Sequence, residues 1–193
     1  FFLGSFVTPT IADEFNNFYL SIGGGVAFPS DIEGDTTLGG TAYDAKQETK
    51  NPGTFSVALG KEFNDYRFEF NYSKTTVKSN KFSLSSGGTG VAATISPNYD
   101  SDLNSFMFYG YKDFVNNTKF TPYGGIGLGT TTIAGKQQTI TTGGTSYKLA
   151  KPDTSVFSFG IKAGASYQIA ESTSVYTEGT YQNLGSYQIT KEG

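Results

Sequence analysis

The stretch that most constrains the fold is Thr54–Lys74, TFSVALGKEFNDYRFEFNYSK, in which apolar and polar residues alternate strictly on both sides of Asn64-Asp65. The second half places Tyr66, Phe68, Phe70 and Tyr72 on one side and Arg67, Glu69, Asn71 and Ser73 on the other. Alternation with a period of two residues is typical of a β-strand with two unlike faces, and a two-residue link between such runs predicts a hairpin. The chain is therefore expected to build a sheet with one polar and one apolar face.

The same alternation recurs along the rest of the chain. Together with the hairpin it predicts seven strands, the others being Phe18–Phe28, Asn104–Phe114, Phe120–Ile133, Val156–Ile169 and Thr173–Asn183. Short links (Asn64-Asp65, Val115–Lys119, Ala170–Ser172) alternate with long polar links (Pro29–Gly53, Thr75–Asp102, Ala134–Thr154), which we expect to be loops, the second of them mobile because of its low complexity. Long and short links that alternate around an antiparallel meander are the signature of an outer-membrane barrel.

This organisation predicts an all-β fold, an antiparallel up-and-down transmembrane β-barrel. Closed bacterial barrels have an even number of strands, so eight strands are expected with seven present, the last following Gly193. Phe1–Ala12, FFLGSFVTPTIA, resembles the tail of a cleavable signal peptide that ends in a small-x-small site. We therefore expect residues 1–12 to be removed and residues 13–193 to form the barrel domain, without its last strand.

Composition narrows the possible functions. The chain has 193 residues, enough for one domain, and 16% of them are charged, against about 25% in soluble domains. It contains no His and no Cys, which excludes Ser-His-Asp and Cys-His catalysis and zinc sites built from His or Cys. The net charge of −3 offers no basic surface for nucleic acid. We predict no cofactor, no metal site, no catalytic residue and no nucleic-acid partner.

The polar face is expected to line the interior, because it carries few charges and they could pair with one another. The predicted interior polar network consists of Glu62, Arg67, Glu69, Asn71, Tyr109, Asp113, Lys162, Glu178 and Gln182. The predicted lipid-facing residues are Leu20, Ile22, Val57, Leu59, Phe68, Phe70, Phe108, Ile126, Leu128, Phe159 and Ile161. An eight-stranded barrel is only wide enough for side chains to fill, so little or no conductance is expected. Gly125, Gly127 and Gly129 are expected to leave room for bulky neighbours inside.

Two further patterns favour a membrane. Aromatic residues of the apolar face cluster near strand ends, as in the interfacial girdles of membrane barrels: Phe18, Phe28, Phe55, Phe63, Tyr66, Tyr72, Phe114, Phe157 and Tyr167. Lys61 and Lys112 lie on the apolar face, but both are near a short turn, so their ammonium groups are expected to reach the interface.

These segments resemble the opacity-protein and OmpA-like group of small eight-stranded outer-membrane barrels. The resemblance runs over Phe18–Asn183, with TPYGGIGLG (Thr121–Gly129) and the YxNLG ending (Tyr181–Gly185) as its most characteristic elements. Gln182 departs from the pattern, since an Arg often follows that Tyr. The resemblance implies a monomeric, non-enzymatic protein of the bacterial outer membrane. It implies a surface antigen, an adhesin or an envelope-stabilising protein whose loops contact host or environmental surface ligands.

Two alternatives remain open at the level of sequence. A secreted or periplasmic lipocalin-like barrel would bind an apolar ligand on the same apolar face, and it predicts that Phe68 and Phe159 are buried inside. An enzyme could use two carboxylates such as Glu69 and Glu178, which would need to lie about 5–10 Å apart in an accessible cleft.

Overall fold

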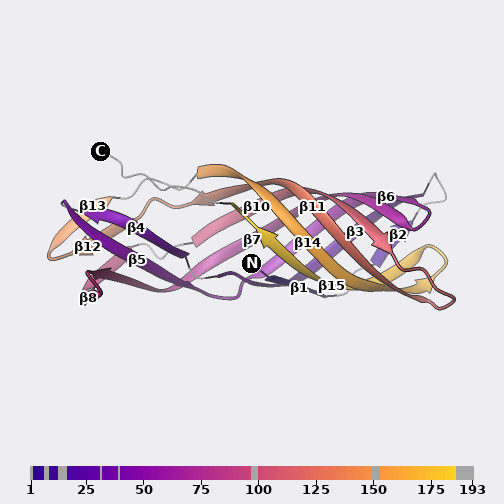
Figure 1. The fold of residues 1–193 in the computed structure, drawn as a ribbon, viewed down its shortest axis with the longest axis horizontal. Coiled ribbons are helices and arrows are strands. Elements are labelled where there is room, and N and C mark those ends of the chain that lie inside the picture. Colours follow the sequence, from indigo (N-terminus) through magenta and orange to yellow (C-terminus); the bar gives the residue numbers. More distant parts are fainter. Residues whose placement is uncertain are drawn as a thin grey trace.

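A computed structural model describes most of the chain, and all regular elements in the described part are β-strands. The described residues are 2–6, 9–12, 17–30, 32–38, 40–96, 100–148 and 153–185. The molecule is elongated, with long tilted strands at one end and shorter strands at the other (Figure 1). Within the described ranges, no helix is long and apolar enough to cross a bilayer.

Seven long strands form the wall: β3 (Phe18–Phe28), β6 (Gly53–Phe63), β7 (Tyr66–Ser86), β10 (Asp100–Asp113), β11 (Phe120–Gly135), β14 (Asp153–Ala170) and β15 (Thr173–Asn183). Each pairs antiparallel with the next along the chain. The predicted meander is confirmed, and β3 and β15 have the predicted bounds. The three short links lie together at one end of the wall, the turn end, and the long links lie at the other, the loop end (Figure 1).

The place expected for an eighth strand is taken by two short strands, β1 (Phe2–Phe6) and β2 (Pro9–Ala12). Both run antiparallel to β3 and to β15: Phe2 pairs with Phe28 and Tyr181, and Ile11 pairs with Leu20 and Thr173. The pairings therefore form a closed ring. Cleavage of residues 1–12 as a signal peptide stays a prediction.

The long links are not irregular loops, and that prediction is wrong. They contain β4 (Ile32–Leu38), β5 (Thr41–Thr49), β8 (Thr89–Val91), β9 (Ala93–Ser96), β12 (Thr139–Thr142) and β13 (Thr145–Lys148). The hairpin of β4 and β5 adds to the distal part of β7, and β12 pairs with β9 and β13. These strands are short and rich in Thr, so the apolar contrast that revealed the wall strands is missing. Residues 97–99 and 149–152 lie outside the described residues.

These strands, together with the distal part of β7, form a compact unit that we call the headpiece. Leu84 of β7 and Ile140 of β12 are buried against each other, each only 2% exposed. Six partly buried side chains pack around them, namely Tyr43, Ala45, Phe82, Val91, Ala93 and Tyr147. The headpiece thus has a small apolar core of its own, drawn from all three long links.

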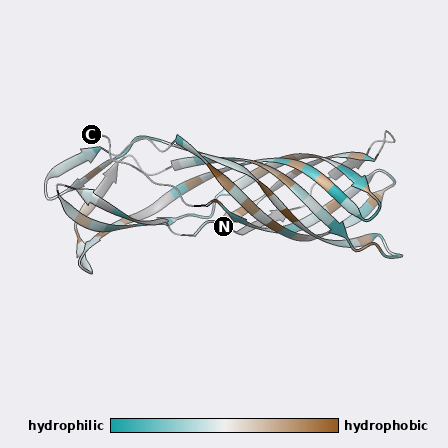
Figure 2. Ribbon diagram, turned by 45° about the horizontal axis from the view of Figure 1, so that its top comes forward, coloured by the Kyte–Doolittle hydropathy of each residue, from teal (hydrophilic) through white to brown (hydrophobic). Residues whose placement is uncertain are grey.

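The apolar face of the wall points outward. Ten of the eleven residues predicted to face lipid are exposed on the outside of the barrel, and Val57 is half-buried. Figure 2 shows the apolar residues concentrated in the long strands and largely absent from the headpiece. Phe68 and Phe159 are 44% and 40% exposed, so the lipocalin-like alternative, which needed them inside, is wrong on this point.

Candidate functional site in the barrel interior

The middle of the barrel holds a buried cation between two carboxylates from other strands. Lys162 of β14 places its Nζ 3.0 Å from Oε1 of Glu178 on β15 and 3.7 Å from Oε1 of Glu69 on β7. All three residues are less than 10% exposed. Each side chain points inward because it occupies the polar face of its strand. Strands far apart in sequence are thus joined across the lumen.

Tyrosine hydroxyls complete the shell of this triad. Tyr111 donates to Oε1 of Glu69 at 2.9 Å, and Tyr19 donates to Oε2 of the same residue at 3.1 Å. Tyr123 donates to Oε2 of Glu178 at 3.1 Å. Buried carboxylates need such donors, because a buried charge without hydrogen bonds carries a large desolvation cost.

A second ion pair lies toward the turn end. Arg67 Nε donates to both carboxylate oxygens of Asp113, at 3.0 and 2.8 Å. The guanidinium carbon also lies 4.6 Å from the ring centre of Tyr123 and 4.7 Å from that of Tyr111. Cation–π contacts of this kind hold a guanidinium away from water with little loss of favourable interaction. The same tyrosines therefore connect this pair to the Lys162 triad.

Toward the loop end, the interior changes from charged to neutral polar groups. The Gln182 amide donates to the hydroxyls of Ser105 and Thr131, both at 3.1 Å. Thr131 also shares hydrogen bonds with Ser105 at 2.8 Å and with Ser158 at 2.7 Å. All of these residues are buried. This layer crosses the lumen from β10 to β15.

An apolar cluster closes the loop end of the lumen. Val77, Leu103 and Ile133 are buried together, with Val156 and Leu184 packed against them. This cluster was not predicted, because the inward face was expected to be polar along the whole barrel. The three buried residues lie on the inward face of strands whose outward face has become polar at the same level, as Thr76 and Asp102 show. Beyond the belt of aromatic residues near the loop end, the apolar side chains of these strands therefore point inward and the polar ones point outward.

Glycines make room for the tyrosines inside. Tyr109 and Tyr111 of β10 stand opposite Gly127 and Gly125 of β11 in the strand register. A Cβ atom on either glycine would overlap the ring of its partner. Tyr19 opposite Gly60 and Tyr123 opposite Gly164 repeat the arrangement. The expectation of bulky neighbours is confirmed for Gly125 and Gly127, whereas a Cβ atom at Gly129 would first meet the backbone of Phe106 and Met107.

Little space is left in this network. A cavity of about 30 Å³ lies between the two charged groups, beside Tyr19, Arg67, Glu69, Lys162 and Glu178. That volume suits about one water molecule. Among the described side chains, no group of three or more His, Cys, Asp or Glu residues is arranged to hold a metal ion.

The structure brings most of the predicted interior residues together. Asn71 donates to Glu69 at 3.5 Å, and Tyr109 lies under the Lys162 ammonium, 4.2 Å from nitrogen to ring centre. Glu62 differs from the others, because its side chain is exposed at the turn end, next to Arg67 in the strand register. Tyr19, Tyr111 and Tyr123 were not among the predicted interior residues. Each lies on the inward, polar face of its strand, and this place in the alternation was the signal that could have identified them.

The two outward lysines lie at the turn end. Lys112 Nζ bonds to Asp65 at 2.8 Å and lies 4.4 Å from the Tyr66 ring centre. Lys61 Nζ lies 4.6 Å from the Phe18 ring centre. Each ammonium therefore has polar or aromatic contacts beside a short turn.

Comparison with protein families agrees with this architecture. The family model described as outer membrane protein beta-barrel domain matches residues 1–192. Outer membrane protein PagN of Salmonella typhimurium is 29% identical over 89 residues, which are 46% of this chain and 37% of PagN. The chain thus matches little more than a third of that relative's length. The crystal structure of Neisserial surface protein A aligns with a TM-score of 0.40 at 14% identity, covering 94% of each chain.

The family match covers nearly the whole chain, and the closed meander with its outward apolar face has the architecture that this family requires. The protein is located in the bacterial outer membrane. The chain belongs to the outer membrane protein β-barrel family.

Proposed function

We propose that this chain is a non-enzymatic outer-membrane barrel, sealed by its own side chains, that presents a folded headpiece to ligands outside the cell. The observation that carries the proposal is the contrast between the two ends. The lumen is filled from Arg67 to Leu103, whereas the headpiece has an independent core around Leu84 and Ile140. A barrel whose lumen is filled by side chains can carry the headpiece but leaves no path for transport.

The interior supports the absence of a pore. Charged, neutral polar and apolar layers follow one another along the lumen, and each joins strands from different sides of the barrel. A stable channel would require several buried ion pairs and hydrogen bonds to break together. We therefore infer that the network is a structural plug.

The interior also gives no support to a carboxylate-pair enzyme. Glu69 and Glu178 are both bound to Lys162 and capped by tyrosines, so neither is free to act as acid or nucleophile. The space beside them is about 30 Å³, far too small for a sugar ring. Glycosidase chemistry needs an accessible cleft between its carboxyl groups.

The exterior supports lipid as the partner of the wall. Aromatic rings occur at two levels, Phe18, Phe63, Tyr66, Phe114, Phe120 and Tyr167 at the turn end and Phe28, Phe55, Tyr72, Phe106, Phe157 and Tyr181 at the loop end. Aliphatic residues and Phe occupy the surface between them. Short turns of outer-membrane barrels face the periplasm, which places the headpiece outside. If lipid contacts the whole outer surface of the wall, no part of that surface is left for a second copy, which is consistent with a monomer.

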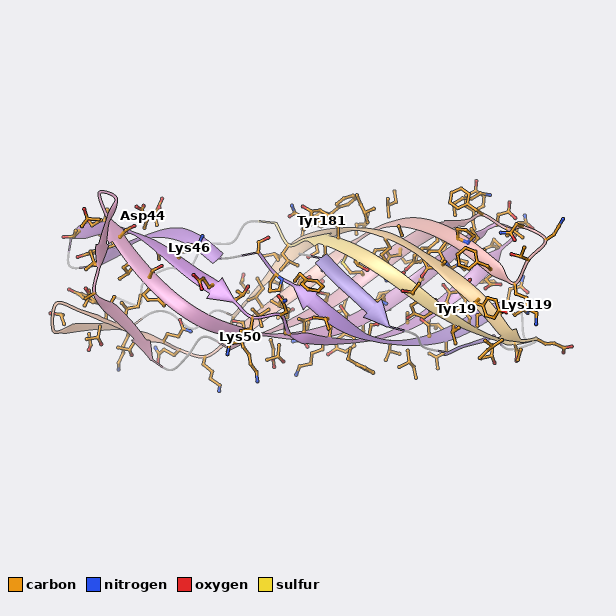
Figure 3. All side chains as sticks on the ribbon, turned by 90° about the horizontal axis from the view of Figure 1, so that it is seen from below. Tyr19, Asp44, Lys46, Lys50, Lys119 and Tyr181 are labelled. Atoms are coloured by element: carbon orange, nitrogen blue, oxygen red, sulfur yellow. The ribbon has the colours of Figure 1, made fainter. Side chains whose placement is uncertain are left out.

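The headpiece supports an adhesive role. The sheets of the headpiece pack against each other through Leu84 and Ile140. They offer a rigid surface beyond the membrane. Figure 3 shows Asp44 and Lys46 on this part, far from the turn-end Lys119. Rigid scaffolds that carry variable polar surfaces are where binding sites occur in proteins.

A cell-attachment assay tests this proposal. We expect Gram-negative cells that display the full chain to attach to epithelial monolayers or to polystyrene more than cells with an empty vector do. Leu84→Ser places a hydroxyl in the headpiece core and removes apolar contacts, a loss of about 2–4 kcal/mol confined to the headpiece. Attachment should fall to the vector level, while the boiled and unboiled protein still migrate differently on a gel.

The matched control is Thr89→Ala on the exposed strand β8, which should attach as the unmodified protein does. Equal attachment of displaying and empty cells on both surfaces would contradict the adhesive role and would favour an envelope-stabilising barrel. In that case, cells that lack the protein should become more sensitive to detergent.

A further inference from the structure

Four exposed lysines lie on the outer surface just beyond the loop-end aromatic ring. Lys74 and Lys78 follow Tyr72 on the outward face of β7, Lys50 precedes β6, and Lys136 follows β11. Figure 3 shows Lys50 at the junction between the wall and the headpiece. We call these residues the loop-end lysines.

Hydrogen bonds and one ion pair hold this surface together. The Lys50 backbone N–H donates to the Lys78 carbonyl at 2.9 Å, so these two residues lie side by side. Lys74 Nζ lies 3.1 Å from Oδ2 of Asp102, and the Thr76 hydroxyl donates to Oδ1 of the same carboxylate at 2.6 Å. The Thr76 hydrogen bond, with the nearby charges of Lys74 and Lys136, lowers the pKa of Asp102.

Four lysines lie at this surface against three acidic residues, Asp102, Asp153 and Asp100, the last of which pairs with Lys78 in the strand register, so the lysines outnumber the acidic residues by one. Asp102 pairs with Lys74, whereas Lys50, Lys78 and Lys136 have no ion-pair partner among the described side chains. The exposed Asp153 on β14 pairs in the strand register with Ala134, two residues before Lys136. Lysines held near one another repel, and an anion bound between them would relieve that repulsion.

The level of the lysines matches the headgroup zone of a bilayer. Aromatic rings mark the edge of the hydrocarbon, and Phe55 pairs directly with Lys74 in the strand register. Lys74 is two residues beyond Tyr72, a rise of roughly 5 Å along a tilted strand. Each headgroup zone is roughly 5–8 Å thick, and lysine side chains can extend along it.

We propose that Lys50, Lys74 and Lys78, assisted by Lys136, bind the phosphate groups of a phosphorylated lipid in the leaflet that surrounds the loop end. Lysine ammonium groups bind phosphate as point charges and need no fixed geometry. Clusters of basic residues next to a membrane-spanning segment attract anionic headgroups in the same way. The acyl chains of such a lipid would lie along Phe55, Tyr72 and Phe106.

Lipid titration of the folded full chain tests the site. The protein in detergent micelles is titrated with diphosphorylated lipid A, and the bound lipid is counted by native mass spectrometry. We expect Lys50→Gln/Lys74→Gln/Lys78→Gln to weaken binding by about tenfold or more, because each lysine near a charged lipid surface contributes several-fold. Added NaCl should weaken binding to the unmodified protein.

The matched control changes the same number of lysines at the other end, Lys61→Gln/Lys112→Gln/Lys119→Gln, and should bind within about twofold of the unmodified protein. Equal weakening by both triple variants, or none by the first, overturns the proposal. A second measurement needs no variant: the unmodified protein should bind diphosphorylated lipid A more tightly than monophosphoryl lipid A. Equal affinities for the two lipids would also overturn it.

Discussion

Lys162→Met is expected to destabilise the folded barrel by about 3–5 kcal/mol, because it removes the cation shared by two buried carboxylates. Glu69 and Glu178 would then face each other inside a lumen with space for about one water molecule. Methionine fills most of the volume of the lysine stem. The expected loss of stability therefore comes from the missing charge and not from a cavity. Urea unfolding of the protein in lipid vesicles, followed by heat-modifiable gel mobility, measures this difference.

Two controls distinguish the buried triad from ordinary ion pairs. Lys112→Met removes an exposed ion pair with Asp65 and should leave the stability of the barrel nearly unchanged. Lys162→Met/Glu69→Gln/Glu178→Gln removes all three charges and should recover much of the stability lost in the single variant. If Lys162→Met were no more harmful than Lys112→Met, the interior triad would have no structural role.

Gly127→Ala is expected to destabilise the barrel by about 3 kcal/mol or to prevent closure, since the new methyl group would overlap the Tyr109 ring. Tyr109 is 1% exposed and is confined by Lys162 and Tyr111, so its ring has no free space to enter. The fraction of refolded protein and its urea midpoint in vesicles measure the effect.

Gly110→Ala is the matched control, one strand away on the outward face. A Cβ atom there would lie 3.7 Å from the nearest atom, on Phe68, an ordinary contact. We expect unchanged stability or a gain of up to about 1 kcal/mol, because alanine restricts the unfolded chain more than glycine does. Similar losses at both positions would show that backbone effects of glycine, and not the tyrosine, determine the result.

The wall could be predicted because each strand of a membrane barrel carries apolar residues on its outward face and small or polar residues on its inward face. Leu128 and Phe159 alternate with Gly127 and Ser158, and this contrast identified both the strands and their inward face. Glycines two residues apart on β11 indicated large inward neighbours. Which neighbours they are depends on strand register, which one sequence does not determine.

The headpiece and the loop-end cluster could not be predicted in the same way. Beyond Tyr72 the outward face becomes polar and the inward face becomes apolar at Val77, so the pattern appears broken at that point although the strand continues. In the headpiece, Leu84 and Ile140 come from different links and are more than fifty residues apart in the sequence. Interior partners such as Tyr19 and Glu69 are equally distant, and only closure of the ring brings them together.

The most direct test of the account asks which face of the wall contacts lipid. The chain contains no Trp, so Phe159→Trp introduces a single fluorophore at the middle of the outer surface, and Tyr43→Trp introduces one in the headpiece. Each variant is refolded into vesicles of phosphatidylcholine brominated on its acyl chains. We expect strong quenching of Phe159→Trp and none of Tyr43→Trp. An unquenched Phe159→Trp, or equal quenching of both variants, would contradict a barrel whose apolar face lies in the membrane.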